Sequence, residues 1–164
     1  MAPMAKTSST PALVVLARAG VEHTVHAFDA SDDGGLGYGR AAAGALGVDE
    51  ARVFKTLLAV ADGLPVVAVV PVAGELSLKA LAAAVGAKRA EMLAVADAER
   101  LTGYVVGGIS PLGQRKRLQT VVDSSWREHD TVYVSAGRRG LDVELAPGEL
   151  VALLGARTAD LSAH

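Results

Sequence analysis

The residues best suited to chemistry lie in the stretch Thr102–Gly113, which the basic run Arg115–Arg117 follows closely. We predict a short strand that enters a glycine-rich loop, with Pro111 fixing the end of that loop. Gly107 and Gly108 carry no side chains, so the backbone there can turn through positive φ and its N–H groups can approach a ligand closely. Bare amides beside positive charge suit an anionic substrate or an oxyanion that develops during a reaction.

A serine inside this loop invites comparison with the nucleophile elbow of hydrolases. The loop reads Gly-Ile-Ser-Pro-Leu over 108–112, whereas an elbow requires the pattern G-x-S-x-G. Leu112 occupies the position of the second glycine, and Pro111 follows the serine directly. We therefore predict that Ser110 contacts the substrate or braces the loop, and that it is not a nucleophile.

Two charged residues lie in otherwise apolar, strand-like runs. Lys55 falls within Val53–Val60, where almost every neighbour is apolar, so its side chain must point to solvent, to a partner or into a site. A lysine that protects an edge strand from aggregation is an equally good interpretation. Asp142 shares a strand face with Glu144, and ion pairing within the sheet is its simplest role.

The sequence lacks the residue patterns that a bound metal or nucleotide cofactor would require. The chain has no cysteines, which excludes disulfides, a thiolate nucleophile and Cys-ligated zinc. None of the four histidines pairs with another at helical ligand spacing, and His23 and His26 should face opposite sides of a strand. Gly37–Ala42 matches the loose dinucleotide fingerprint, with Asp62 beyond it, but residues 29–36 separate it from the preceding strand. A helix entry is the better interpretation of that segment.

Composition indicates one globular domain. The 164 residues are 51% hydrophobic and only 4% aromatic, so the core must be built from Ala, Val and Leu. We predict a flexible lead over residues 1–9 and one domain over residues 10–160. The valine-rich, uncharged run Gly63–Gly74 is far shorter than the roughly 20 residues of a membrane-spanning helix. We therefore expect a cytoplasmic protein that has no membrane partner.

Charge is distributed unevenly along the chain. The net charge of −2 argues against general nucleic-acid binding, yet residues 101–140 hold six basic and three acidic side chains. A solvated basic face is the simpler explanation of this excess. Weak, transient contact with an RNA end is the more specific one.

Turn and cap signals predict helices and strands that interleave irregularly. Thr10-Pro11 begins a helix that Gly20 ends, Asp62-Gly63 is a hairpin turn, and Ser77 caps another helix. We predict strands over 21–28, 53–61, 65–70, 88–92, 118–122, 131–135 and 141–145, and helices over 11–19, 40–46, 78–84, 96–101 and 147–154. The predicted fold class is mixed α/β, with a largely antiparallel mixed sheet and flanking helices.

Several ordered blocks together resemble one protein family from about residue 10 to residue 160. They are Thr10-Pro11-Ala12, His26 with an aromatic residue two positions later, Val53-Phe-Lys-Thr-Leu57, Pro71-Val-Ala-Gly-Glu-Leu-Ser-Leu-Lys79, Val85-Gly-Ala-Lys-Arg-Ala-Glu-Met92, Thr102–Gly113, Val132-Tyr-Val-Ser135 and Arg139-Gly-Leu-Asp142. The chain resembles the YbaK/EbsC family of freestanding aminoacyl-tRNA editing proteins, whose GxxxP loop is similar to Gly107–Pro111. Within that family it is most similar to bacterial Cys-tRNA(Pro) deacylases.

The resemblance implies a YbaK-like fold and a trans-editing hydrolase that removes the amino acid from misacylated tRNA, with Cys-tRNA(Pro) as the expected substrate. The reaction would be an ester hydrolysis without metal, cofactor or covalent enzyme intermediate, assisted by the thiol of the substrate. Lys55 would hold the tRNA terminus or the aminoacyl group, and amides of Gly107, Gly108 and Ile109 would hold the ester carbonyl. The expected substrate-binding residues are Phe28, Ser110, Pro111 and Asp142.

The implied partners are misacylated tRNA and proline–tRNA ligase, with the protein itself a monomer or weak homodimer. Weak tRNA contacts are expected from Arg115, Lys116, Arg117 and Arg139. An Ala-tRNA or Ser-tRNA deacylase of the same family is the enzymatic alternative. A non-catalytic module that binds a nucleotide or an aminoacyl ligand is the alternative from another class.

The chain departs from the pattern of its relatives at three places. Phe28 stands where they often carry tyrosine, Arg40-Ala41 replace an acidic pair, and the loop 29–36 differs. Amino-acid preference is therefore the part of the resemblance that transfers least securely.

Overall fold

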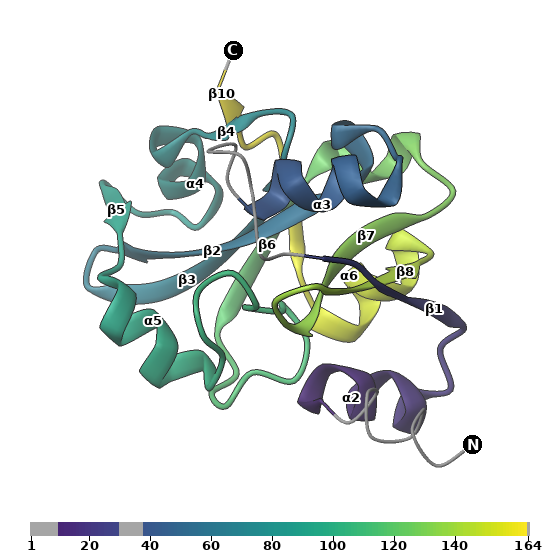
Figure 1. Ribbon diagram of the computed structural model, residues 1–164. Coiled ribbons are helices and arrows are strands. Elements are labelled where there is room, and N and C mark those ends of the chain that lie inside the picture. Colours follow the sequence, from purple (N-terminus) through teal and green to yellow (C-terminus); the bar gives the residue numbers. More distant parts are fainter. Residues whose placement is uncertain (1–9, 30–37, 164) are drawn as a thin grey trace.

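The computed structural model describes residues 10–29 and 38–163, and within them the chain is a mixed α/β domain (Figure 1). The expected lead over residues 1–9 and most of the divergent loop, residues 30–37, lie outside the described residues. Three sheets form in place of the single sheet that we expected: one has five strands, one three and one two. The prediction of a mixed, largely antiparallel α/β fold is confirmed.

The five-stranded sheet is ordered β5-β2-β3-β6-β9. Its members are β2 (Phe54–Ala61), β3 (Leu64–Pro71), β5 (Ala90–Met92), β6 (Gln119–Asp123) and β9 (Arg157–Ala159). β2 and β3 form the expected hairpin, and Asp62 and Gly63 both have positive φ, at 48° and 84°, as a tight primed turn requires. β6 and β9 join in parallel, so their connections cross over the faces of the sheet.

The three-stranded sheet is antiparallel and is ordered β1-β8-β7. It comprises β1 (His23–Ala27), β7 (Val132–Arg138) and β8 (Leu141–Leu145). Val134, Val143 and Leu145 lie on its buried face, in the main core between the two larger sheets. His26, Tyr133 and Asp142 lie on its other face, because side chains alternate along a strand. This second face is polar and borders the cavity described below.

Helices cover the outer faces of the sheets. They are α2 (Pro11–Ala19), α3 (Tyr38–Leu46), α4 (Leu78–Ala84), α5 (Val95–Thr102) and α6 (Pro147–Leu154), with 3-10 turns at Glu50–Arg52 and Ser124–Glu128. A small third sheet joins β4 (Glu75–Leu76) to β10 (Ser162–Ala163). In Figure 1, α3 and α4 lie above the five-stranded sheet and α5 lies below it, while α2 lies beneath the three-stranded sheet. A second core cluster, which includes Val70, Leu81 and Val121, packs beneath α4.

The predicted caps are confirmed. Thr10 Oγ1 accepts a hydrogen bond from the Leu13 N–H at 3.2 Å, Pro11 is in the first turn, and Gly20 ends α2 in the left-handed conformation. Ser77 caps α4 through the Ala80 N–H. One prediction was wrong: no strand precedes the glycine loop. Gly103 ends α5, and residues 104–118 run as an irregular loop in which the Tyr104 hydroxyl donates to the Leu112 carbonyl at 2.7 Å.

Candidate active site

A cavity of about 420 Å³ opens at the free edge of β2. Its floor is the run Val53–Leu58. Ser135 of β7 and Asp142 of β8 line one side, and residues of β5 and α5 line the other. Phe28, α3 and the glycine loop complete the lining. The volume is in the range of small-ligand pockets, which typically measure roughly 300–1,000 Å³.

Lys55 lies on this floor, which is one of the placements that its apolar neighbours in the sequence left open. Burial lowers the pKa of its ammonium group, Glu75 raises that pKa, and Arg40 lowers it again. Among the described residues none forms an ion pair with Lys55. A half-buried cation that forms no ion pair within the described part of the chain is suited to an anionic group of a ligand.

The glycine loop brings two backbone amides to the cavity. Gly107 and Ile109 line it, and Gly107 has a φ of 92°, which explains the glycine there. Neither N–H makes a hydrogen bond within the described part of the chain. Two free amides beside a cavity can stabilise an oxyanion.

Gly108 differs from its neighbours, although we expected all three amides to act together. Its N–H donates to the Val105 carbonyl at 2.9 Å, and it is not part of the cavity lining. A Cβ atom at this position would lie 2.6 Å from the Cα of Arg138. Gly108 therefore allows the loop to pack against the β7–β8 turn, and it sets the position of the amides on either side.

Asp142 supplies a buried carboxylate, and only 6% of its surface is exposed. Burial raises its pKa to about 6, while the nearby His26 opposes that rise. No hydrogen bond or ion pair joins its side chain to another described residue. The ion pairing within the sheet that we considered its simplest role is therefore absent from the described residues. A carboxylate in this setting is ready to accept a cationic or hydrogen-bond-donating group of a ligand.

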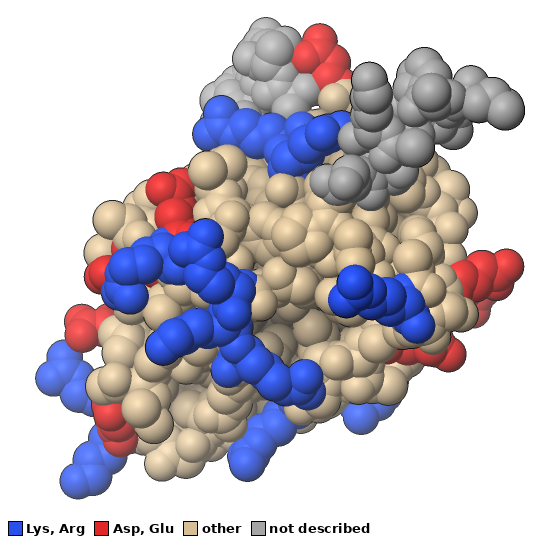
Figure 2. All heavy atoms as spheres, turned by 90° about the horizontal axis from the view of Figure 1, so that it is seen from below, with Lys and Arg blue, Asp and Glu red and all other residues tan. Residues whose placement is uncertain are grey.

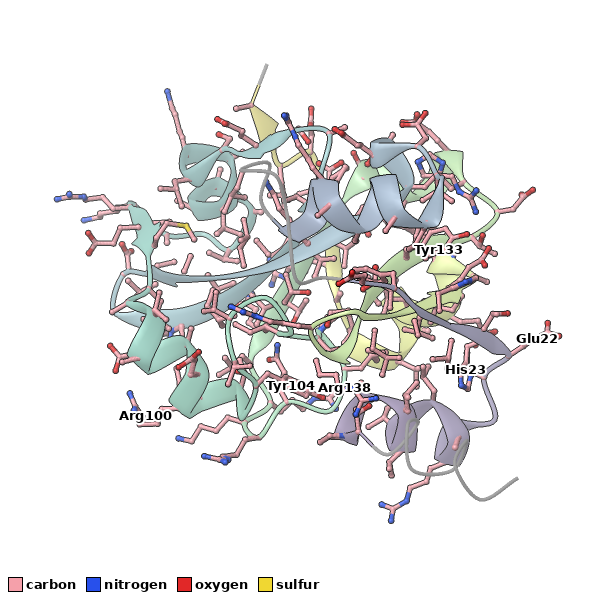
Figure 3. The ribbon with its side chains drawn as sticks, viewed as in Figure 1. Glu22, His23, Arg100, Tyr104, Tyr133 and Arg138 are labelled. Atoms are coloured by element: carbon pink, nitrogen blue, oxygen red, sulfur yellow. The ribbon has the colours of Figure 1, made fainter. Side chains whose placement is uncertain are left out.

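Glu144, two residues further along β8, is held by a polar network instead. Its carboxylate accepts hydrogen bonds from Thr131 Oγ1 at 2.6 Å and lies 2.9 Å from His26 Nε2. The Thr131 hydrogen bond is the largest influence that lowers the pKa of Glu144. Tyr133 packs beneath α3 (Figure 3), with the His26 ring 5.3 Å from its own and the Arg52 guanidinium 5.2 Å above it. This network fixes the wall behind Asp142.

The three remaining residues that we predicted to bind the substrate are placed differently from one another. Phe28 lines the cavity, and its N–H donates to the Gly140 carbonyl at 2.9 Å. Ser110 is fully buried, and its Oγ accepts from the Leu112 N–H, so it braces the loop. Pro111 lines a separate, smaller cavity. The structure thus brings Lys55, Gly107, Ile109, Phe28 and Asp142 together, and it leaves Ser110 and Pro111 outside.

The predicted tRNA-contacting residues lie on the surface. Arg139 Nε donates to the Val106 carbonyl at 3.2 Å, which places this arginine over the glycine loop. Arg115 Nη1 approaches the Arg100 carbonyl at 3.4 Å, at the end of α5. Figure 2 shows lysine and arginine side chains gathered in a band across the face that lies below in Figure 1.

Within residues 10–29 and 38–163 no group of three His, Asp or Glu side chains could hold a metal ion. In the same part of the chain no helix is long and apolar enough to cross a membrane.

The residues that match the loose dinucleotide fingerprint have structural roles in this fold. Asp62 accepts hydrogen bonds from the N–H groups of Lys88 and Arg89, and Gly39 lies where any Cβ would collide with Val72.

Sequence reasoning missed the apolar side of the cavity, formed by Met92, Leu93, Val95, Ala98 and Val106, and it also missed Thr56. In the sequence these are ordinary core-type residues in separate elements. The sign that distinguishes them is the exposure of their large apolar side chains, and exposure can be seen only once the fold is known.

Comparison with known proteins places the chain. The family model "Aminoacyl-tRNA editing domain" matches residues 39–153. An Enterococcus faecalis protein provisionally named Cys-tRNA(Pro)/Cys-tRNA(Cys) deacylase EbsC is 42% identical over 118 residues, which are 71% of this chain and 72% of that protein.

Solved structures agree in fold. A crystal structure described provisionally as a trans-editing enzyme for prolyl tRNA synthetase is 24% identical, with a TM-score of 0.83 over 96% of this chain and 98% of that one. A crystal structure of a hypothetical protein is 26% identical, with a TM-score of 0.82 over 94% of this chain and 100% of that one. The matched family model spans α3 to α6 and includes Lys55, the glycine loop and Asp142. The chain belongs to the aminoacyl-tRNA editing domain family.

Proposed function

We propose that this protein is a trans-editing deacylase that hydrolyses the ester of misacylated tRNA, with Cys-tRNA(Pro) as its substrate. One observation carries the proposal: a single cavity joins a half-buried lysine, two free loop amides and a buried carboxylate. The 42% identity to a protein provisionally named a Cys-tRNA(Pro)/Cys-tRNA(Cys) deacylase supports it.

Each group has a part in the reaction that its chemistry suits. The Asp142 carboxylate binds the α-ammonium group of the aminoacyl moiety. The N–H groups of Gly107 and Ile109 donate to the ester carbonyl oxygen as negative charge develops on it. Lys55 binds the ribose or phosphate at the tRNA terminus. One such oxyanion donor is typically worth about 100- to 1,000-fold in rate, so positioning and two donors suffice for an activated ester.

The attacking group comes from the substrate when the amino acid is cysteine. The thiol sulfur forms a bond to its own carbonyl carbon, and the bond from that carbon to the ribose oxygen breaks. The amino acid leaves as a cyclic thiolactone, which water then opens to free cysteine, so that the net reaction is hydrolysis of the ester. The thiol proton ends on the ribose oxygen, which leaves as the free hydroxyl of the tRNA. This route needs no nucleophile from the enzyme, in agreement with the placement of Ser110 away from the cavity.

The basic band seen in Figure 2 meets the tRNA acceptor end. The contacts come from the exposed side chains of Arg115, Lys116, Arg117 and Arg139. At a net charge of −2 the protein binds tRNA only weakly on its own. Proline–tRNA ligase is therefore the partner that presents the substrate, in the cytoplasm, to a monomer or weak dimer.

The test measures amino-acid release from Cys-tRNA(Pro), Ala-tRNA(Pro) and Pro-tRNA(Pro). Wild type is compared with Lys55→Ala and with Lys79→Ala, a control on the exposed surface of α4. We expect rapid loss of cysteine alone, at least 100-fold slower in Lys55→Ala and unchanged in Lys79→Ala. Preferential release of alanine, or of serine from Ser-tRNA, would identify a different substrate for the same site. Binding without release, even with proline–tRNA ligase added, would indicate a non-catalytic module.

A further inference from the structure

The free edge of β2 is covered at both ends and open between them. At its start, Val53 forms an isolated parallel bridge to Tyr133 of β7. At its far end, β5 pairs with residues 59–61, and the Leu93 N–H donates to the Leu58 carbonyl at 3.0 Å. Between these two closures β7 and β5 diverge, and the cavity occupies the gap.

Thr56 presents its backbone to this gap. The Val72 N–H donates to the Val53 carbonyl at 2.7 Å, so odd-numbered residues at this end of β2 bond to β3. Even-numbered residues direct their N–H and C=O groups to the opposite edge, as Leu58 does. Thr56 therefore offers one donor and one acceptor, side by side, that no described strand pairs.

The Thr56 side chain also carries a polar group without a partner in the described structure, which is a second and independent observation. Its hydroxyl Oγ1 is buried and has no hydrogen-bond partner among the described residues. Unsatisfied buried polar groups are rare in folded proteins, and a missing ligand or water is their usual explanation. The polar groups of Thr56 thus mark a place where a ligand is expected.

The surface next to Thr56 is apolar and open. Met92, Val95 and Val106 line the cavity and yet are 49%, 58% and 38% exposed. A planar ring that enters the gap from solvent would cover these side chains. Purine bases bury their faces on apolar side chains and leave their edges free for hydrogen bonds.

We infer that the gap is a nucleobase subsite for the terminal adenosine of tRNA, in which adenine packs against Met92, Val95 and Val106 while the Thr56 backbone reads its edge. The Thr56 N–H donates to adenine N1, and the Thr56 carbonyl accepts from the 6-amino group. This inference rests on the proposed function, because an aminoacylated tRNA ends in adenosine. It divides the cavity into a base half beside α5 and an aminoacyl half beside Asp142.

The experiment replaces single atoms of the terminal base, so the protein stays unaltered. Cysteinylated tRNA(Pro) is prepared with adenosine, purine riboside (no 6-amino group), 1-deazaadenosine (no N1) or 7-deazaadenosine at its end. We expect kcat/KM to fall roughly three- to tenfold for the first two analogues, the effect of one lost hydrogen bond, and to stay unchanged for 7-deazaadenosine. Equal kcat/KM for all four termini would overturn the subsite.

A binding measurement separates this inference from the proposed function. If even the natural substrate is not hydrolysed, the proposed function fails, and adenosine alone decides the subsite. The amide resonance of Thr56 is followed by NMR as adenosine or purine riboside is added. A shift that adenosine produces at lower concentration than purine riboside supports the subsite, and an unmoved Thr56 resonance at saturation contradicts it.

Discussion

His26 and Asp142 lie directly opposite each other on β1 and β8, yet the imidazole directs its Nε2 to Glu144, at 2.9 Å. Asp142 thus has a histidine as an electrostatic neighbour but not as a hydrogen-bond partner among the described residues. The carboxylate that faces the cavity is left available for a ligand, while the carboxylate behind it is fully engaged. The first two predictions follow from this division.

Asp142→Asn should make the protein more stable at neutral pH and nearly inactive. The folded-state pKa, about 6, lies above the ordinary aspartate value of 3.8, so the folded state holds a proton that the unfolded state has lost between these pH values. Stability therefore falls as pH rises from about 4 to 6, and the asparagine variant escapes this loss. We expect a gain of about 3 kcal/mol in unfolding free energy at pH 7.5 and only a small part of it at pH 4. Urea unfolding at both pH values checks this, and an equal gain at both would contradict it.

His26→Asn should shift the acid limb of the deacylation rate to higher pH. His26 lowers the pKa of Asp142, so its removal lets burial raise that pKa further. The ionised carboxylate that binds the α-ammonium group then forms only at higher pH. The pH profile of kcat/KM, compared with wild type, measures the shift. A profile that falls evenly at every pH would indicate a packing role for His26 instead.

Gly108→Ala should reduce deacylation by about 100-fold or more, because the new Cβ would lie 2.6 Å from the Arg138 Cα and must displace the loop amides. Gly44→Ala is the matched control. Gly44 lies in α3 with nothing within 4 Å of an added Cβ, so alanine there should stabilise by roughly 0.5–1 kcal/mol. Release assays and thermal unfolding of both variants test the pair. Full activity of Gly108→Ala would show that the loop position is not set by this contact.

Thr56→Val should raise the unfolding free energy by about 1 kcal/mol, because it removes a buried hydroxyl that has no partner in the described structure. Thr120→Val is the opposite case. The Thr120 hydroxyl donates to the Leu118 carbonyl at 3.1 Å, so valine there should destabilise the fold. Chemical denaturation compares the two variants. Destabilisation by both would mean that the Thr56 hydroxyl is satisfied in solution.

The parts of this protein that sequence reasoning predicted are those with local causes. Asp62-Gly63 specifies its hairpin within four residues, and Thr10 and Ser77 cap helices that begin beside them. Lys55 could be singled out because its immediate neighbours are apolar. These signals do not depend on where other segments lie.

The predictions that needed correction depend on distant contacts. Gly108 looked like a third amide for the substrate, but its environment is set by Arg138, thirty residues later. Val105 and Val106 resemble a strand, but no neighbouring strand pairs with them in the described structure. The cavity forms because β7 and β5 contact opposite ends of β2 and leave a gap between them. No single segment of the sequence encodes that gap.

The length of the opening on β2 has a consequence for the behaviour of the protein at high concentration. An exposed strand edge normally recruits edges from other molecules and starts aggregation. Here the bridge at Val53 and the hydrogen bond at Leu58 confine the opening to a few residues around Thr56. A second protein chain would need several consecutive positions to add as a strand, whereas a single flat base needs one. The protein can therefore keep a backbone position permanently unpaired for recognition without offering a template for self-association.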